Sequence, residues 1–131
     1  MVFVNTADII LSPRDKGPLA HDSVILSRLI WTLCRRPNRG LTLEHSVLSQ
    51  LLRAGTSVGA NIREAQFAES KKDFDHKLKI AEKELGETYY WLGVVTTEPP
   101  LVDVKELETI LATALNVRRM LIATIQTARK S

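Results

Sequence analysis

Residues 53–65 read Arg-Ala-Gly-Thr-Ser-Val-Gly-Ala-Asn-Ile-Arg-Glu-Ala, and residues 83–92 read Lys-Glu-Leu-Gly-Glu-Thr-Tyr-Tyr-Trp-Leu. The first stretch has a helical pattern but is rich in small residues, although a glycine inside a helix costs roughly 1 kcal/mol relative to alanine. Close approach of a neighbouring helix would offset that cost. The two stretches therefore predict two helices that pack closely together. The small residues of the first are Ala54, Gly55, Ser57, Gly59 and Ala60.

Length and composition fit one domain with a single core. The chain has 131 residues, of which 44% are apolar and 25% are charged. Its one cysteine, Cys34, excludes an intramolecular disulfide and is typical of a small apolar core residue in a reducing compartment. The longest apolar stretch, residues 24–34, is broken by Arg28 and is too short to span a bilayer. We therefore expect a cytoplasmic protein with no targeting or membrane segment.

Hydrophobic periodicity predicts helices from about residue 22 to 36, from about 42 to 69, from 71 to the Pro99-Pro100 pair, and from 104 onward. Ser70, with Asp73 three residues later, and Asp103 are the expected N-caps of the last two helices. The apolar arc of the last helix is broad. Amphipathic helices with short links predict an all-α, antiparallel, up-and-down four-helix bundle over residues 21–131.

Residues 1–20 carry no sustained helical stripe, because Pro13, Gly17 and Pro18 interrupt them. We expect an extended or partly disordered N-terminal arm. Its apolar residues make packing on the bundle or on a neighbouring molecule plausible. These residues are Val2, Phe3, Val4, Ile9, Ile10 and Leu11.

The motif Ser57-Val58-x-x-Asn61-Ile62-x-Glu64 is followed by Leu78-x-Ile80-Ala81 and Glu87-Thr88-x-Tyr90-Trp91-Leu92. This pattern resembles the four-helix-bundle family encoded in intervening sequences of some bacterial large-subunit (23S) ribosomal RNA genes. The resemblance covers residues 22–130 and is most specific over 50–92.

That resemblance implies a small cytosolic bacterial protein that assembles as a homopentamer. It also implies a distant relation to accessory variability proteins of retroelements, in which a basic surface on the pentamer contacts a polymerase and nucleic acid. Ala65 and Glu84 depart from the commoner family pattern, which has glycine and serine there. They suit a branch for which the resemblance implies no assigned activity.

A second contact surface is predicted on the two central helices. Short polar side chains lie opposite the apolar stripe of the second helix, where a solvated surface would favour lysine, glutamate and arginine. A mixed apolar and acidic flank on the third helix also fits an interface better than open surface. We expect these flanks to meet between subunits, although a solvated surface is the alternative. With Trp31, the predicted oligomer interface comprises Gln50, Ser57, Asn61, Glu64, Glu84, Glu87 and Trp91.

Arg118 stands in the middle of the apolar arc of the fourth helix. Burying an arginine alone is costly, so we expect a buried or interfacial ion pair with Glu64, Glu84 or Glu87. The alternative is that Arg118 extends to solvent from a bundle end.

Catalytic chemistry finds little support in the sequence. His21, His45 and His76 lie on different segments, so no helical face carries a metal-binding pair. No phosphate-binding loop follows a strand, and no Glu-x-x-His repeat is present for a di-iron site. We therefore expect a protein that is not an enzyme and that holds no metal or cofactor.

Basic residues form two short stripes. Arg28 and Arg35 share the outer face of the first helix with Trp31, and Lys72, Lys79 and Lys83 line the outer face of the third. The net charge of +3 is too small to indicate nucleic-acid binding by itself. Repetition in an oligomer would multiply a weakly basic face.

The leading hypothesis is therefore multivalent binding to RNA, DNA or a nucleic-acid-processing protein through these five residues. The alternatives are an ordinary solvated lysine face, a protein-only scaffold that presents Trp31, Tyr90 and the arm, and a passenger of its genetic element without a strong ligand.

Overall fold

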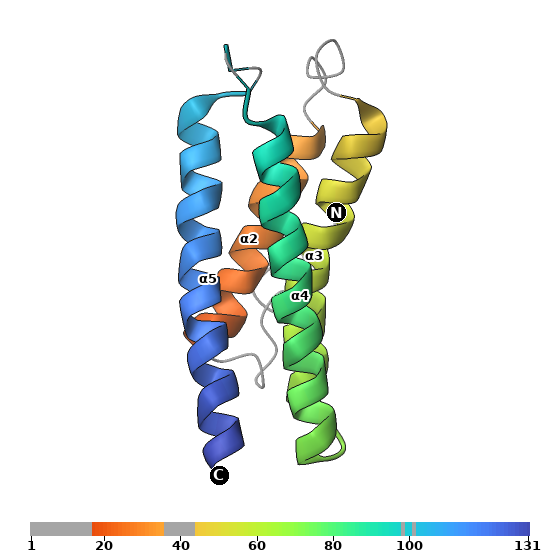
Figure 1. The fold of residues 1–131 in the computed structure, drawn as a ribbon, viewed down its shortest axis with the longest axis vertical. Helices are drawn as coiled ribbons and strands as arrows, with labels where there is room; N and C mark the ends of the chain where they lie inside the picture. Colours follow the sequence, from red (N-terminus) through yellow and green to blue (C-terminus); the bar gives the residue numbers. More distant parts are fainter. Residues whose placement is uncertain (1–16, 36–43, 98, 101) are drawn as a thin grey trace, which may run out of the picture.

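The computed structural model describes residues 17–35, 44–97, 99, 100 and 102–131. These ranges hold four helices and no strand: α2 (Pro18–Arg35), α3 (His45–Gln66), α4 (Lys71–Val95) and α5 (Val104–Lys130). Successive helices run in opposite directions along the long axis of the molecule (Figure 1). The all-α, four-helix prediction is confirmed.

The helices occupy the corners of a bundle. Helix α2 packs against α3 and α5, and α4 packs against the same two helices. Helices α2 and α4 therefore lie at opposite corners, with α4 in front and α2 behind in Figure 1. At one end of the bundle an ion pair of 3.2 Å joins Asp75 Oδ1 of α4 to Arg129 Nε of α5.

One continuous apolar core runs between the four helices. Each helix contributes side chains at spacings of three and four residues, as amphipathic packing requires. The predicted apolar arc of α5 is wider than the core, because Leu111 and Leu115 remain 36% and 40% exposed. The largest fully buried side chains include Leu26, Ile30, Leu33, Leu51, Ile62, Leu78, Leu85, Leu92, Ile110 and Leu121.

The helix starts follow local chemistry. Ser70 Oγ accepts a hydrogen bond of 3.0 Å from the Asp73 amide, and the Asp103 carboxylate accepts from the Lys105 and Glu106 amides, so both predicted caps are confirmed. Helix α2 begins at Pro18 rather than near residue 22. Proline is tolerated in the first turn of a helix, because the backbone N–H that it lacks would have no hydrogen-bond partner there. The bundle therefore starts before the predicted arm boundary at residue 20.

The ends of α3 differ from the prediction or lie outside the described chain. Helix α3 ends at Gln66, three residues before the predicted end at Glu69. The predicted start near residue 42 lies outside the described residues, as does most of the predicted arm.

Helices α3 and α4 pack against each other, as predicted, but the two glycines of α3 face α2. A β-carbon on Gly55 would overlap Ile30 Cδ1, and one on Gly59 would lie 3.1 Å from Ser27 Oγ and 3.2 Å from the Ser23 carbonyl oxygen. On α4, a β-carbon on Gly86 would meet nothing within 4 Å. The glycines of α3 are therefore required by the approach of α2.

Among the described helices, none is both long enough and apolar enough to cross a membrane.

Candidate oligomer interface and basic surface

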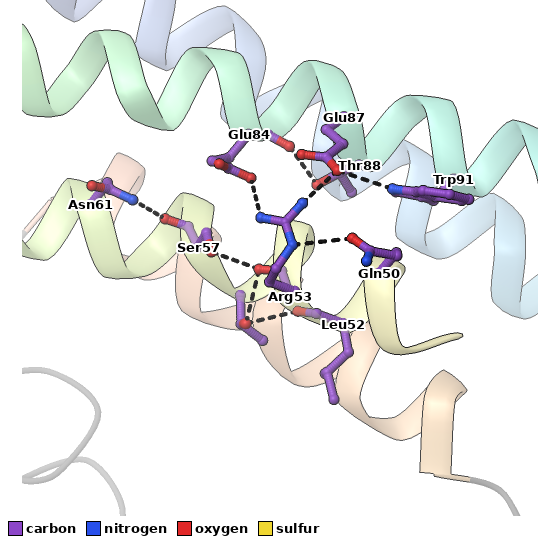
Figure 2. A network of polar contacts seen from close by, with 10 residues as sticks. Gln50, Leu52, Arg53, Ser57, Asn61, Glu84, Glu87, Thr88 and Trp91 are labelled. Carbon is purple, nitrogen blue, oxygen red and sulfur yellow. Dashed lines mark hydrogen bonds and ion pairs between the residues drawn. The ribbon is translucent and has the colours of Figure 1, made fainter. Parts of the chain in front are cut away.

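Arg53 of α3 is the centre of a polar network on the face shared by α3 and α4 (Figure 2). Its Nη1 donates a hydrogen bond of 3.1 Å to Glu84 Oε2, and its Nη2 donates to Glu87 Oε1. Its Nε donates to Gln50 Oε1 over 3.2 Å. Trp91 Nε1 donates to the same Glu87 oxygen over 3.2 Å. One guanidinium thus connects one turn of α3 to two turns of α4.

Helical spacing places these groups opposite each other. Gln50 and Arg53 are three residues apart on α3, whereas Glu84, Glu87 and Trp91 follow at intervals of three and four on α4. The side-chain oxygens of Gln50, Glu84 and Glu87 therefore all point toward Arg53. The rigid fork of a guanidinium can hold two carboxylates at once, which a lysine ammonium does less well.

The next turns of α3 are covered by side chains bonded to their own helix. Ser57 Oγ donates to the Arg53 carbonyl oxygen over 2.6 Å, and Asn61 Nδ2 donates to the Ser57 carbonyl oxygen over 2.8 Å. Such back-bonded polar groups project little from the helix. No long side chain therefore projects from this part of α3, so another molecule can approach the helix closely.

The charges of the network stabilise one another. The hydrogen bond from Arg53 lowers the pKa of the Glu87 carboxyl, and the hydrogen bond from Trp91 lowers it further. The hydrogen bond to Glu87 raises the pKa of Arg53, and the Glu84 contact adds to that effect. Because these groups are open to solvent, screening keeps their contribution to stability small in the isolated chain.

The network brings together six of the predicted interface residues within one chain. The α3 and α4 flanks already meet on the surface of a single chain, because α3 and α4 are neighbours. Contact of these flanks with another subunit stays a prediction. Sequence reasoning missed Arg53, although its position three residues after Gln50 and four before Ser57 places it on the predicted face. The six residues are Gln50, Ser57, Asn61, Glu84, Glu87 and Trp91.

The other two predicted interface residues lie apart from Arg53. Glu64 Oε2 forms an ion pair of 3.1 Å with Lys77 Nζ, nearer the end of the α3–α4 face. Trp31 lies on α2, at the opposite corner from α4. It is 49% exposed, and the Arg35 guanidinium lies 5.4 Å from its ring centroid.

The predicted buried ion pair of Arg118 is wrong within the single chain. Arg118 is exposed, while Glu84 and Glu87 bind Arg53 and Glu64 binds Lys77. The apolar arc around Arg118 is wider than the core, so its guanidinium reaches solvent. Pairing across a subunit contact stays a prediction.

Arg118 instead lines a small cavity between α4 and α5. The cavity measures about 210 Å³ and is also lined by Glu82, Gly86, Tyr89 and Ile122. The Tyr89 hydroxyl is buried without a hydrogen-bond partner, and burial raises its pKa, partly offset by the charges of Arg118 and Arg119. We call this cavity the α4–α5 groove.

The five predicted basic residues fall into two groups on opposite corners of the bundle. Lys72, Lys79 and Lys83 are exposed on α4, and Lys79 Nζ pairs with Glu82 Oε1 over 2.6 Å. Tyr90 continues this face and is 62% exposed. Arg28 and Arg35 are exposed on α2. One chain therefore presents two basic faces rather than a single patch.

No group of three or more potential metal ligands occurs within the described ranges. The three histidines are distributed over α2, α3 and α4.

The fold defines a small all-α protein of four helices. The chain matches the model of the 23S rRNA-intervening sequence protein family over residues 22–123, and it belongs to that family. This confirms the resemblance carried by the motif at residues 57–92.

A solved structure supports the same assignment. It is a protein of unknown function from the S23 ribosomal protein family of Bacteroides thetaiotaomicron VPI-5482, with 34% sequence identity and a TM-score of 0.73. The match covers 82% of this chain and 98% of that one. None of the curated proteins matches this sequence.

Proposed function

We propose that the protein is a non-catalytic bacterial homopentamer that binds RNA, DNA or a ribonucleoprotein weakly and multivalently. The observation that carries this proposal is the outward face of α4, where Lys72, Lys79 and Lys83 stand exposed in line with Tyr90. These positions differ by seven, four and seven residues, which places them on one side of a helix. We call this row the α4 basic stripe.

The chemistry of the stripe suits a phosphate backbone. Lysine ammonium groups attract phosphates without reading sequence, and an exposed tyrosine ring offers a surface on which a base can stack. Lys79 is partly neutralised by Glu82 in the isolated chain. Binding by one chain would therefore be weak, and the function would depend on several copies.

A ring of subunits would gather the stripes on one surface. The α4 basic stripe lies between two flanks of the chain, the Arg53 network toward α3 and the α4–α5 groove toward α5. A head-to-tail contact of one flank with the other flank of the next subunit is the kind of interface that closes into a ring. Every stripe would then face the same way. The number five rests on the family resemblance.

Repetition supplies the affinity that one stripe lacks. Once one subunit holds a nucleic acid, the remaining stripes meet it at high effective concentration, so the combined affinity can exceed that of a single site by about 10²–10⁴. Such binding should fall steeply with added salt, because each phosphate contact releases condensed counterions.

The test is a charge-neutralised stripe. The triple variant Lys72→Gln/Lys79→Gln/Lys83→Gln should bind a mixed pool of short RNA and DNA about tenfold or more weakly in fluorescence anisotropy at low salt. It should also show a smaller salt dependence. The matched control is Arg28→Gln/Arg35→Gln on α2, which should bind like the unmodified protein. Unchanged binding by the triple variant, or an equal loss in the control, would contradict the proposal.

A protein-binding scaffold is the second candidate, favoured by the exposed ring of Trp31. Tryptophan is enriched among the residues that carry most of the binding energy in protein–protein contacts. A partner held mainly by apolar contact would stay bound at high salt, which separates this function from nucleic-acid binding.

A further inference from the structure

An open trough lies at the end of the bundle where α3 ends and α4 begins. It measures about 670 Å³, and its walls come from α3, α4 and α5. Ala65 and Phe74 line it from α3 and α4, and Ala123 and Ala128 line it from α5. Ala68 is also apolar, and the remaining lining residues, Gln66, Ser70, Lys71, Thr124, Thr127 and Ser131, are polar or charged. The exposed surface of the trough is nevertheless more apolar than polar.

The trough exists because α2 is too short to reach this end. Helix α2 has 18 residues, whereas α5 has 27. At 1.5 Å per residue, α5 is longer by about 13 Å. Figure 1 shows α4 and α5 continuing past the start of α2.

The trough begins where α2 begins. Ala20, in the first turn of α2, lies beside Gly59 and Ile62 of α3. Ala65, at the near edge of the trough, is one turn further along α3. The bundle thus has a fourth side that α2 fills up to this level and that the described residues leave open beyond it.

We propose that residues 1–16, the part of the chain directly before α2, fill this trough in the same molecule. They include Val2, Phe3 and Val4 and the run Ile9-Ile10-Leu11, which need an apolar surface to pack against. Sixteen residues can extend for roughly 50 Å, which is ample for the length that α2 leaves open.

The junction with α2 favours such a path. Gly17 has φ +136°, a backbone conformation that residues with a β-carbon rarely adopt. The Gly17 carbonyl oxygen accepts the first hydrogen bond of α2 from the His21 amide over 3.1 Å. The chain therefore enters α2 through a glycine turn, at the end of α2 that is nearer the trough.

The decisive experiment is amide hydrogen exchange of residues 2–11 in the full chain. Ala123→Arg places a charged side chain in the trough, at a position that is already exposed, so the bundle should still fold. The matched control is Ala112→Arg, three turns earlier on the same side of α5 and outside the trough. Exchange of residues 2–11 should be about tenfold faster in Ala123→Arg than in Ala112→Arg. Equal exchange in the two variants would overturn the proposal.

A second experiment asks whether the segment belongs to the same chain. In a Cys34→Ser background, Ile10→Cys is combined with Thr127→Cys, which lines the trough, or with Gln126→Cys, an exposed neighbour that does not line it. Oxidation should join residues 10 and 127 within one chain several-fold more than residues 10 and 126. A disulfide that joins two chains would assign the trough to the arm of a second copy and contradict this proposal.

Discussion

Gly55 of α3 leaves no room for a side chain beside Ile30 of α2. A β-carbon there would overlap Ile30 Cδ1 and lie 3.1 Å from Cγ2 of the same fully buried side chain. We predict that Gly55→Ala destabilises the protein by about 1–3 kcal/mol, because a close-packed core resists an added methyl group. The measurement is urea unfolding.

Gly86→Ala is the matched control, because its β-carbon would meet open space on α4. It should leave stability unchanged or raise it by up to about 1 kcal/mol through helix propensity. Equal effects of the two substitutions on stability would show that the packing of α2 does not require a glycine at position 55.

The Glu87 carboxylate should make stability depend on pH. Its pKa lies below the ordinary value of 4.5 because it accepts hydrogen bonds from Arg53 and Trp91. A carboxyl with a lowered folded-state pKa contributes stability above its ordinary pKa and loses that contribution as pH falls through the folded value. We therefore predict that Glu87→Gln lowers the urea midpoint at pH 7 and that the difference shrinks as the pH falls below 4.5 and disappears once the carboxyl is protonated in the folded protein.

Glu108→Gln provides the control for this titration, since Glu108 is an exposed residue of α5. Its urea midpoint should follow that of the unmodified protein at every pH. A Glu87→Gln difference that is independent of pH would mean that packing, and not charge, explains the effect.

Ser70 holds the first turn of α4. Its hydroxyl accepts from the Asp73 amide over 3.0 Å, and the Asp73 carboxylate accepts from the Glu69 amide over 3.3 Å. We predict that Ser70→Ala destabilises the protein by about 0.5–2 kcal/mol in thermal unfolding. Ser49→Ala, at an exposed position inside α3, should be neutral or slightly stabilising. A neutral Ser70→Ala would show that tertiary packing alone fixes this helix end.

The existence of all four helices could be predicted because each carries apolar residues at spacings of three and four. Two of the helices also begin at a capping side chain. The start of α2 could not, since Pro18 reads equally well as an interruption and as a first-turn residue. The two glycines of α3 indicated close approach by a neighbouring helix but did not indicate that this helix is α2. Which neighbour takes up that face depends on the packing of the whole bundle, with α2 on one side and α4 on the other.

Most residues of the polar network could be predicted from the sequence, but the contacts that join them could not. Helical geometry correctly grouped Gln50, Ser57 and Asn61, and separately Glu84, Glu87 and Trp91, because residues on one helix face follow from spacing alone. That Arg53 joins the two groups depends on α3 and α4 being neighbours in one chain. The predicted buried ion pair of Arg118 was wrong within one chain for a similar reason. The apolar arc around Arg118 lies partly on the surface and not in the core.

At the scale of the molecule, the two basic faces point away from opposite corners of the bundle. A single chain therefore offers a nucleic acid only one short stripe at a time, and the proposed function requires assembly. The α4 basic stripe has the Arg53 network on one flank and the α4–α5 groove, which polar and apolar side chains line together, on the other. This arrangement fits a ring in which unlike flanks meet.

The most direct test of this account is the light-scattering mass of the purified chain at low and high salt, with and without a mixed pool of short RNA and DNA. The account predicts five times the chain mass of 14.7 kDa at both salt concentrations, and a further increase with nucleic acid only at low salt. A monomer under all conditions, or a pentamer whose mass nucleic acid never changes, would contradict it.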